Sequence, residues 1–149
     1  MKKYFLVLLP VLFFIQCKTL KNSEASTIIE FEKTPCSGQC PTYKVEIKTD
    51  QSIYWNGISN VSKIGEYKTL LTSDQYNDLI NSFEQIRFFE LKDSYKSFMM
   101  DLPTTFISYT KNGQTKKIKA YDNIPKELLE LIKKTELLLE KLAWEKTNK

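Results

Sequence analysis

Histidine is absent from this 149-residue chain, and cysteine occurs only three times. The absence of histidine removes the most common general base of enzymes. The sequence also has no serine nucleophile elbow, no glycine-rich phosphate loop and no spaced carboxylate motif for a metal. We therefore expect a non-enzymatic protein with no catalytic residues, no metal and no cofactor.

A strong excess of charge of one sign is also missing. The chain has 22 basic and 18 acidic residues, and removal of Lys2 and Lys3 with a leader would leave 20 − 18 = +2. The basic residues are scattered among acidic ones, so we expect no nucleic-acid partner. Lys116 with Lys117 and Lys133 with Lys134 are interpreted as solvated faces.

The longest apolar run extends from Tyr4 to Ile15, directly after a short basic start. A membrane-spanning helix needs about twenty residues, and this run has about a dozen. A basic start, an apolar stretch and a processing site are typical of a secretory signal peptide, which we place at residues 1–16. An uncleaved signal anchor is the alternative.

Cys17 stands where a bacterial lipoprotein signal carries the cysteine that is lipidated. Phe14 and Gln16 depart from the usual pattern of that signal, and an ordinary cleaved signal with an incidental Cys17 is the alternative. Lipidation, with palmitate among the acyl chains, would hold the protein firmly on one membrane leaflet. Residues 17–26 would then be the lipidated cysteine and a polar, flexible tether.

Cys36 and Cys40 remain as a pair once Cys17 is assigned to the anchor. An exported protein meets an oxidising compartment, which favours a disulfide between them. If the flanking strands form a hairpin, the two cysteines face each other at a spacing that a disulfide can bridge. A redox dithiol, a metal site and a free buried pair are the alternatives.

The rest of the chain, residues 27–146, is predicted to be a single α+β domain. Residues 28–33, 43–48, 52–55, 63–71, 104–110 and 115–120 show the patterns of strands, with turns at Asp50-Gln51, Asn56-Gly57 and Asn112-Gly113. One helix follows a capping box from Thr72 to Gln75, and a second follows Pro125. We expect an antiparallel sheet of about five to six strands with both helices packed on one face.

The cysteine segment resembles that of the bacterial lipoprotein family known as domain of unknown function 6438. The residues that carry the resemblance are Pro35, Cys36, Gly38, Cys40, Pro41, Tyr43, Gly57, Gly65, Phe88, Phe89, Leu91, Tyr95, Asp101, Pro103, Pro125 and Leu128. One departure is Asp50-Gln51, where the family usually has Asp-Gly. The resemblance covers residues 27–142 and implies a lipoprotein domain, without implying an activity.

Asp93, Tyr95 and Asp101 form the one polar cluster outside the cysteine segment that is a candidate for ligand binding. The alternative is that Asp101 satisfies amides of its own loop, as aspartates often do.

Together these observations predict a lipid-anchored envelope protein on the outer membrane. They do not distinguish the periplasmic face of that membrane from the surface face. It would bind an unidentified envelope protein or a small ligand. An envelope enzyme or thiol-redox protein that uses Cys36 and Cys40, and a structural envelope component, are the alternatives.

Overall fold

The computed structural model describes residues 24–96, 98 and 101–147. The predicted signal peptide, Cys17 and most of the predicted tether lie outside the described residues. None of the described helices is both long and apolar enough to cross a membrane.

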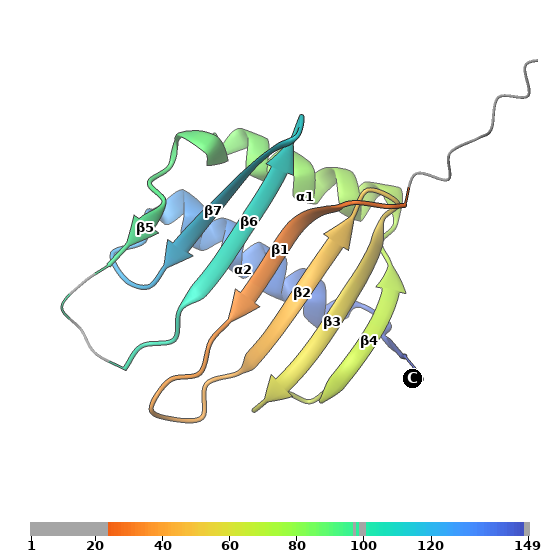
Figure 1. Cartoon of the computed structure of the whole chain (residues 1–149), viewed down its shortest axis with the longest axis horizontal. Helices are drawn as coiled ribbons and strands as arrows, with labels where there is room; N and C mark the ends of the chain where they lie inside the picture. The colour runs from red at the N-terminus through yellow and green to blue at the C-terminus, as the bar shows by residue number, and fades with distance from the viewer. Residues whose placement is uncertain (1–23, 97, 99–100, 148–149) are drawn as a thin grey trace, which may run out of the picture.

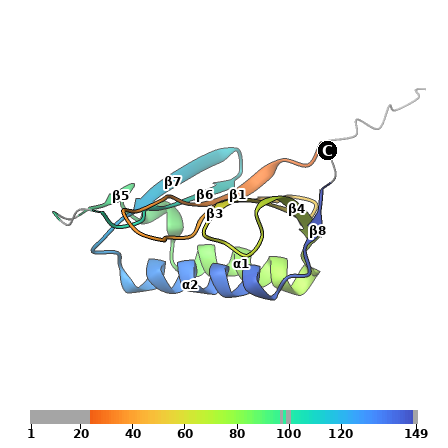
Figure 2. The same cartoon turned by 90° about the horizontal axis from the view of Figure 1, so that it is seen from below.

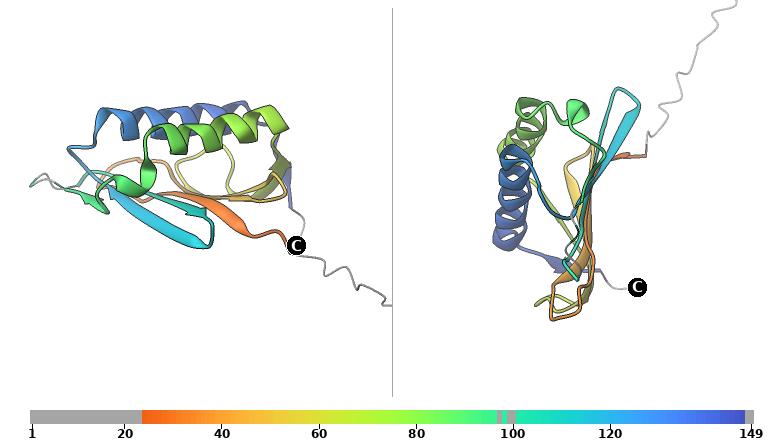
Figure 3. Two further views of the ribbon diagram at one scale, coloured as in Figure 1. Left: turned by 90° about the horizontal axis from the view of Figure 1, so that it is seen from above. Right: turned by 90° about the vertical axis from the view of Figure 1, so that its left-hand side faces the viewer.

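Two helices cover one face of an eight-stranded sheet (Figures 1 and 2). The strands are β1 (Thr27–Lys33), β2 (Thr42–Lys48), β3 (Ser52–Ser59), β4 (Gly65–Leu70), β5 (Ser94–Tyr95), β6 (Thr105–Lys111), β7 (Gln114–Ala120) and β8 (Glu145–Lys146). The helices are α1 (Ser73–Gln85), the short 3-10 helix η1 (Phe88–Glu90) and α2 (Lys126–Lys141). The other face of the sheet is open (Figure 3).

The strands lie in the order β5-β7-β6-β1-β2-β3-β4-β8. Every neighbouring pair is antiparallel except β5 with β7, which is parallel. The prediction of an antiparallel sheet with two helices on one face is therefore confirmed in outline, and the parallel β5–β7 pair is the exception. The predicted number of strands was too low, because the edge strands β5 and β8 have two residues each and are too short to show a period.

The core lies between the sheet and the helices. Alternate residues of the central strands point into it, as Ile29 and Phe31 do from β1, with exposed fractions of 1% and 0%. From the other side, α1 contributes Leu79 and Phe83, and α2 contributes a buried stripe. That stripe consists of Leu128, Leu131, Ile132, Thr135 and Leu139.

The first helix begins as predicted. The Gln75 amide donates to the Thr72 hydroxyl at 3.2 Å, and the Thr72 amide donates to the Gln75 side chain at 2.9 Å. The predicted hairpin at Asn112-Gly113 is also present, and both residues have positive φ, as a tight two-residue turn requires.

The turn predicted at Asn56-Gly57 is wrong. Both residues lie inside β3, where Gly57 pairs with Tyr43 on one side and with Gly65 on the other. Strand β3 continues to Ser59, and residues 60–64 connect it to β4. The need for a glycine at position 57 comes from close packing of the loop of residues 60–64 on β3.

Candidate functional site

Three connections gather at one end of the sheet, at the bottom of Figure 1. They are the cysteine loop between β1 and β2, the loop of residues 60–64 between β3 and β4, and residues 101–104, which precede β6. The chain enters β1 at the opposite end of the strand, at Thr27. This end of the domain therefore lies one strand length, about 20 Å, from the point of entry.

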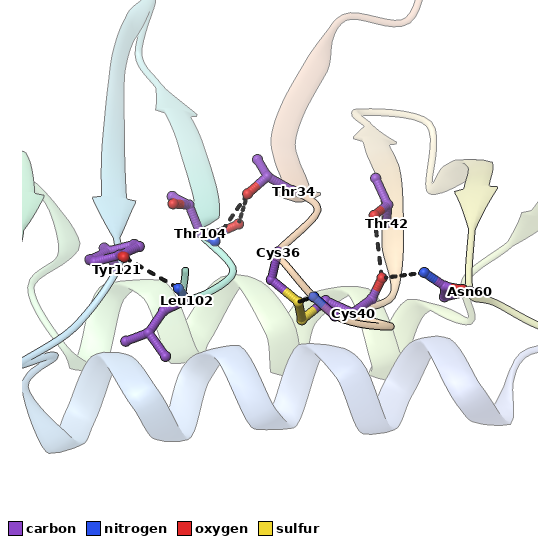
Figure 4. Close-up of a disulfide and its surroundings, with 9 residues drawn as sticks. Thr34, Cys36, Cys40, Thr42, Asn60, Leu102, Thr104 and Tyr121 are labelled. Carbon is purple, nitrogen blue, oxygen red and sulfur yellow. Dashed lines mark hydrogen bonds between the residues drawn. A yellow bond between two sulfur atoms is a disulfide. The ribbon is translucent and has the colours of Figure 1, made fainter. Parts of the chain in front are cut away.

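Cys36 and Cys40 form a disulfide, as predicted, with their Cα atoms 5.7 Å apart (Figure 4). The Cys40 carbonyl accepts a hydrogen bond from the Asn60 side chain at 3.1 Å and one from the Thr42 hydroxyl at 3.4 Å. These contacts connect the cysteine loop to the loop that follows β3.

Thr34 and Thr104 join the cysteine loop to the start of β6 (Figure 4). The Thr34 amide donates to the Thr104 carbonyl at 3.0 Å, and the Thr104 amide donates to the Thr34 hydroxyl at 3.0 Å. Beside them, the Leu102 amide donates to the Tyr121 hydroxyl at 3.2 Å. The cysteine loop is thus held from both sides.

A cleft of 380 Å³ lies next to the cysteine loop, between the sheet and the C-terminal half of α2. Its lining consists of Lys33, Pro41, Tyr43, Trp55, Asn60, Val61, Ser62, Lys63, Glu136, Leu139, Glu140 and Trp144. The volume falls in the range of small-ligand sites in proteins. A second depression, of 420 Å³, lies on the open face of the sheet. Its lining includes Lys44 and Glu46 of β2, which form an ion pair with each other.

Three aromatic rings line the cleft. Tyr43 stacks on Trp55 with ring centroids 4.3 Å apart and an interplanar angle of 19°. Trp144 lies tilted against Trp55, with centroids 5.8 Å apart. The indole N–H of Trp55 donates to the Lys63 carbonyl at 2.9 Å, and that of Trp144 donates to the Leu139 carbonyl at 3.0 Å. Since both N–H groups have partners, the tryptophans offer ring surface to a ligand.

Gly57 permits this arrangement. A Cβ atom at position 57 would overlap with the Lys63 carbonyl oxygen and would lie 2.7 Å from Nε1 of Trp55. The loop after β3 therefore folds directly over the backbone of β3, and its Lys63 carbonyl reaches the Trp55 indole. The backbone at Gly57 has ordinary negative φ, so the requirement is for space and not for a left-handed conformation.

The charged groups of the cleft come from both layers of the domain. Lys33, at the end of β1, forms an ion pair with Glu136 of α2, and both side chains are about three-quarters buried. Glu140 follows one turn later on the same face of the helix. Burial raises the pKa of Tyr43 well above its usual range, and the negative charges of Glu136 and Glu140 add to this effect. Tyr43 is therefore a neutral hydroxyl at physiological pH.

The C-terminal segment forms one wall of the cleft. After α2 ends at Lys141, Trp144 turns back onto Trp55, and β8 then pairs with β4. The Thr147 amide and hydroxyl both donate to the Glu66 carbonyl, at 3.0 and 3.1 Å. Trp144 is thus held between the end of a helix and a short edge strand.

Asp93, Tyr95 and Asp101, the other predicted site residues, lie outside this cleft. The Asp93 carboxylate pairs with Lys116 at 2.6 Å, and the Tyr95 hydroxyl accepts from the Lys92 amide at 3.1 Å. These contacts give Asp93 and Tyr95 structural roles; ligand binding by the three residues stays a prediction. Within the described residues, no group of three or more histidine, cysteine, aspartate or glutamate side chains is placed to hold a metal ion.

Sequence reasoning missed the aromatic cleft. Tyr43 entered as part of a predicted strand and through the resemblance, Trp55 entered as part of a strand, and Glu136 and Trp144 were not singled out. One signal was available, because the chain has only two tryptophans and both line this cleft.

Comparison with known proteins adds one match. A family model described as domain of unknown function (DUF6438) matches residues 27–139, whereas no curated protein matches significantly. The match includes the cysteine loop and most of the cleft, and it ends just before Glu140 and Trp144. Since it covers more than half of the chain, the chain belongs to the DUF6438 family.

Proposed function

We propose that the chain is a lipid-anchored protein of the bacterial envelope, and that its domain binds a small ligand or a partner through the aromatic cleft. The observation that carries the binding role is the cleft itself, with three aromatic rings and four charged side chains of both signs. Such a mixture of ring surface and a few polar groups is typical of binding sites.

The position of the cleft agrees with anchoring at the N-terminus. A tether of about ten residues reaches at most about 35 Å when extended. The cleft lies at the end of β1, beyond the point where the tether enters the domain. A domain anchored through Cys17 is therefore free to present the cleft away from the membrane.

The anchor is tested by replacing Cys17 with alanine in the full chain and fractionating the cells. We expect the protein to move from the membrane to the soluble envelope fraction, because the acyl chains supply the membrane affinity. A double variant with Cys36→Ser and Cys40→Ser controls for loss of a thiol and should stay with the membrane. Retention in the membrane fraction of a Cys17→Ala protein whose intact mass shows that residues 1–16 have been removed would refute the lipid anchor.

The binding role is tested by cross-linking in the same cells. The variant Trp144→Ala removes an aromatic wall of the cleft, and we expect it to lose cross-linked species that the unmodified chain forms. Leu137→Ala is the matched control, because Leu137 is an apolar residue of α2 that is 55% exposed and lies outside the cleft. An identical cross-linking pattern for all three proteins would argue against binding through the cleft.

A further inference from the structure

The aromatic cleft offers ring faces in its interior and hydrogen-bonding groups at its rim. Trp55 has Tyr43 stacked on it and Trp144 tilted against it, and both tryptophans line the cleft, so a ligand meets the ring surface that these contacts leave free. Both indole N–H groups already donate to backbone carbonyls. The interior therefore favours a ligand with an apolar face that lies flat on an indole.

The rim supplies both donors and acceptors. The loop that follows β3 contributes Asn60, Ser62 and Lys63, and α2 contributes Glu140. The Asn60 side chain already donates to the Cys40 carbonyl, so Ser62, Lys63 and Glu140 are the groups most available to a ligand. Ammonium and amide groups donate hydrogen bonds, carboxylates accept them, and a hydroxyl does both. A ligand that matches this rim carries groups that both donate and accept.

The formal charge of the lining argues against a charged ligand. Lys33 and Lys63 contribute two positive charges, and Glu136 and Glu140 contribute two negative charges, so the sum is 2 − 2 = 0. Glu136 is moreover committed to Lys33. An organic cation gains from aromatic faces, but it also needs an excess of negative charge to replace its hydration. An anion would need the opposite excess.

We propose that the cleft binds a short neutral saccharide. A sugar ring has one face formed by C–H groups, which buries apolar area on an indole, and its edge carries hydroxyls that donate and accept. The ring lies against the Trp55–Trp144 pair, with hydroxyls donating to Glu140 and accepting from Lys63. This inference rests on the binding role proposed above and names the class of ligand.

The two tryptophans make the test direct, because the whole indole fluorescence of the chain comes from the walls of the cleft. The full chain is purified in a polyoxyethylene detergent, which has neither a sugar nor a cationic headgroup. It is titrated with the trisaccharide of N-acetylglucosamine, with maltotriose and with cellotriose. We expect a saturable fluorescence change with at least one of them, at a Kd below about 1 mM.

Glu140→Gln keeps both tryptophans and removes a charged acceptor from the rim. We expect it to weaken saccharide binding about tenfold, as the loss of a hydrogen bond to a charged group does. Glu127→Gln is the matched control, because Glu127 is an exposed residue in the first turn of the same helix and lies outside the cleft. It should bind as the unmodified chain does.

Spermidine, choline and sulfate are titrated in parallel. A response to none of the three saccharides, or saccharide binding that Glu140→Gln leaves unchanged, would overturn the saccharide assignment. If spermidine or choline saturates the fluorescence instead, the saccharide assignment fails while the binding role of the cleft stands. If no ligand changes the fluorescence of the unmodified chain, and Trp144→Ala forms the same cross-links as the unmodified chain, the proposed function fails as well.

Discussion

Replacement of Gly57 by alanine is the sharpest test of how the cleft is built. The new Cβ would overlap with the Lys63 carbonyl oxygen, and this atom belongs to the backbone. A side chain could rotate away, but a backbone carbonyl moves only if the loop of residues 60–64 moves with it. We therefore expect the loop to lift from β3 and the hydrogen bond from Trp55 to Lys63 to break.

Two contributions set the magnitude of the effect. Insertion of a methyl group into a packed site that must rearrange costs about 1–3 kcal/mol. Loss of the 2.9 Å hydrogen bond between Trp55 Nε1 and the Lys63 carbonyl costs about 1 kcal/mol more. We expect Gly57→Ala to lower the free energy of unfolding by about 2–4 kcal/mol. With a urea m value of about 2 kcal/mol/M, the midpoint falls by about 1–2 M.

Urea unfolding followed by tryptophan fluorescence measures this change, and it also reports a red shift if the Trp55 indole becomes hydrated in the folded variant. Gly38→Ala is the matched control, because a Cβ at position 38 would have Sγ of Cys36 as its nearest neighbour, at an ordinary 3.8 Å. It should unfold within about 0.5 kcal/mol of the unmodified chain. Equal stability of Gly57→Ala and the unmodified chain would refute the close packing of the loop on β3.

Three further predictions concern stability. Replacing Cys36 and Cys40 together by serine opens a loop with a sequence separation of four, so the free energy of unfolding in urea should fall by about 2 kcal/mol. A fall below about 0.5 kcal/mol would contradict a native disulfide. The pKa of Tyr43 is raised in the folded chain and lies near 10 in the unfolded chain. Above about pH 10 the unfolded chain therefore binds fewer protons than the folded chain. The free energy of unfolding then falls with pH, by up to about 1.4 kcal/mol per pH unit. In Tyr43→Phe this part of the fall should be absent, and identical pH dependence of urea unfolding in both proteins would contradict the shift. Thr72→Ala removes the capping box of α1 and should cost about 1 kcal/mol in thermal unfolding; an unchanged midpoint would count against the cap.

Local patterns in the sequence predicted the local structure well. Alternation in residues 43–48 predicted β2, and Asn112-Gly113 predicted a tight hairpin that the structure has. Each of these signals depends on neighbours along the chain. Asn56-Gly57 carries the same turn signal, yet it lies in a strand, because Gly57 is needed where a distant carbonyl packs on the backbone. Tertiary packing overrides a local turn preference there.

The candidate site was predictable only in part. Cys36 and Cys40 lie close in the sequence, so their pairing could be predicted from their spacing and from the expectation that the protein is exported. The aromatic cleft brings together Tyr43, Trp55 and Trp144 from β2, β3 and the segment after α2. About ninety residues separate Trp55 from Trp144, and the contact exists only because β8 returns to β4. No periodicity within one segment contains that information.

The position of β1 in the sheet has a consequence for folding during synthesis. β1 is the first strand of the domain, yet it lies near the middle of the sheet, between β2 and β6. The four strands β1–β4 can pair once residues 27–70 have left the ribosome, because each neighbours the next in sequence. The second edge of β1 then stays unpaired until residues 105–111 arrive as β6. Closing this pair spans about seventy residues and carries the entropic cost of a long loop, so we expect it to be the slow step of folding. During that interval the unpaired backbone edge of β1 is the part of the chain most open to wrong pairing or to a chaperone.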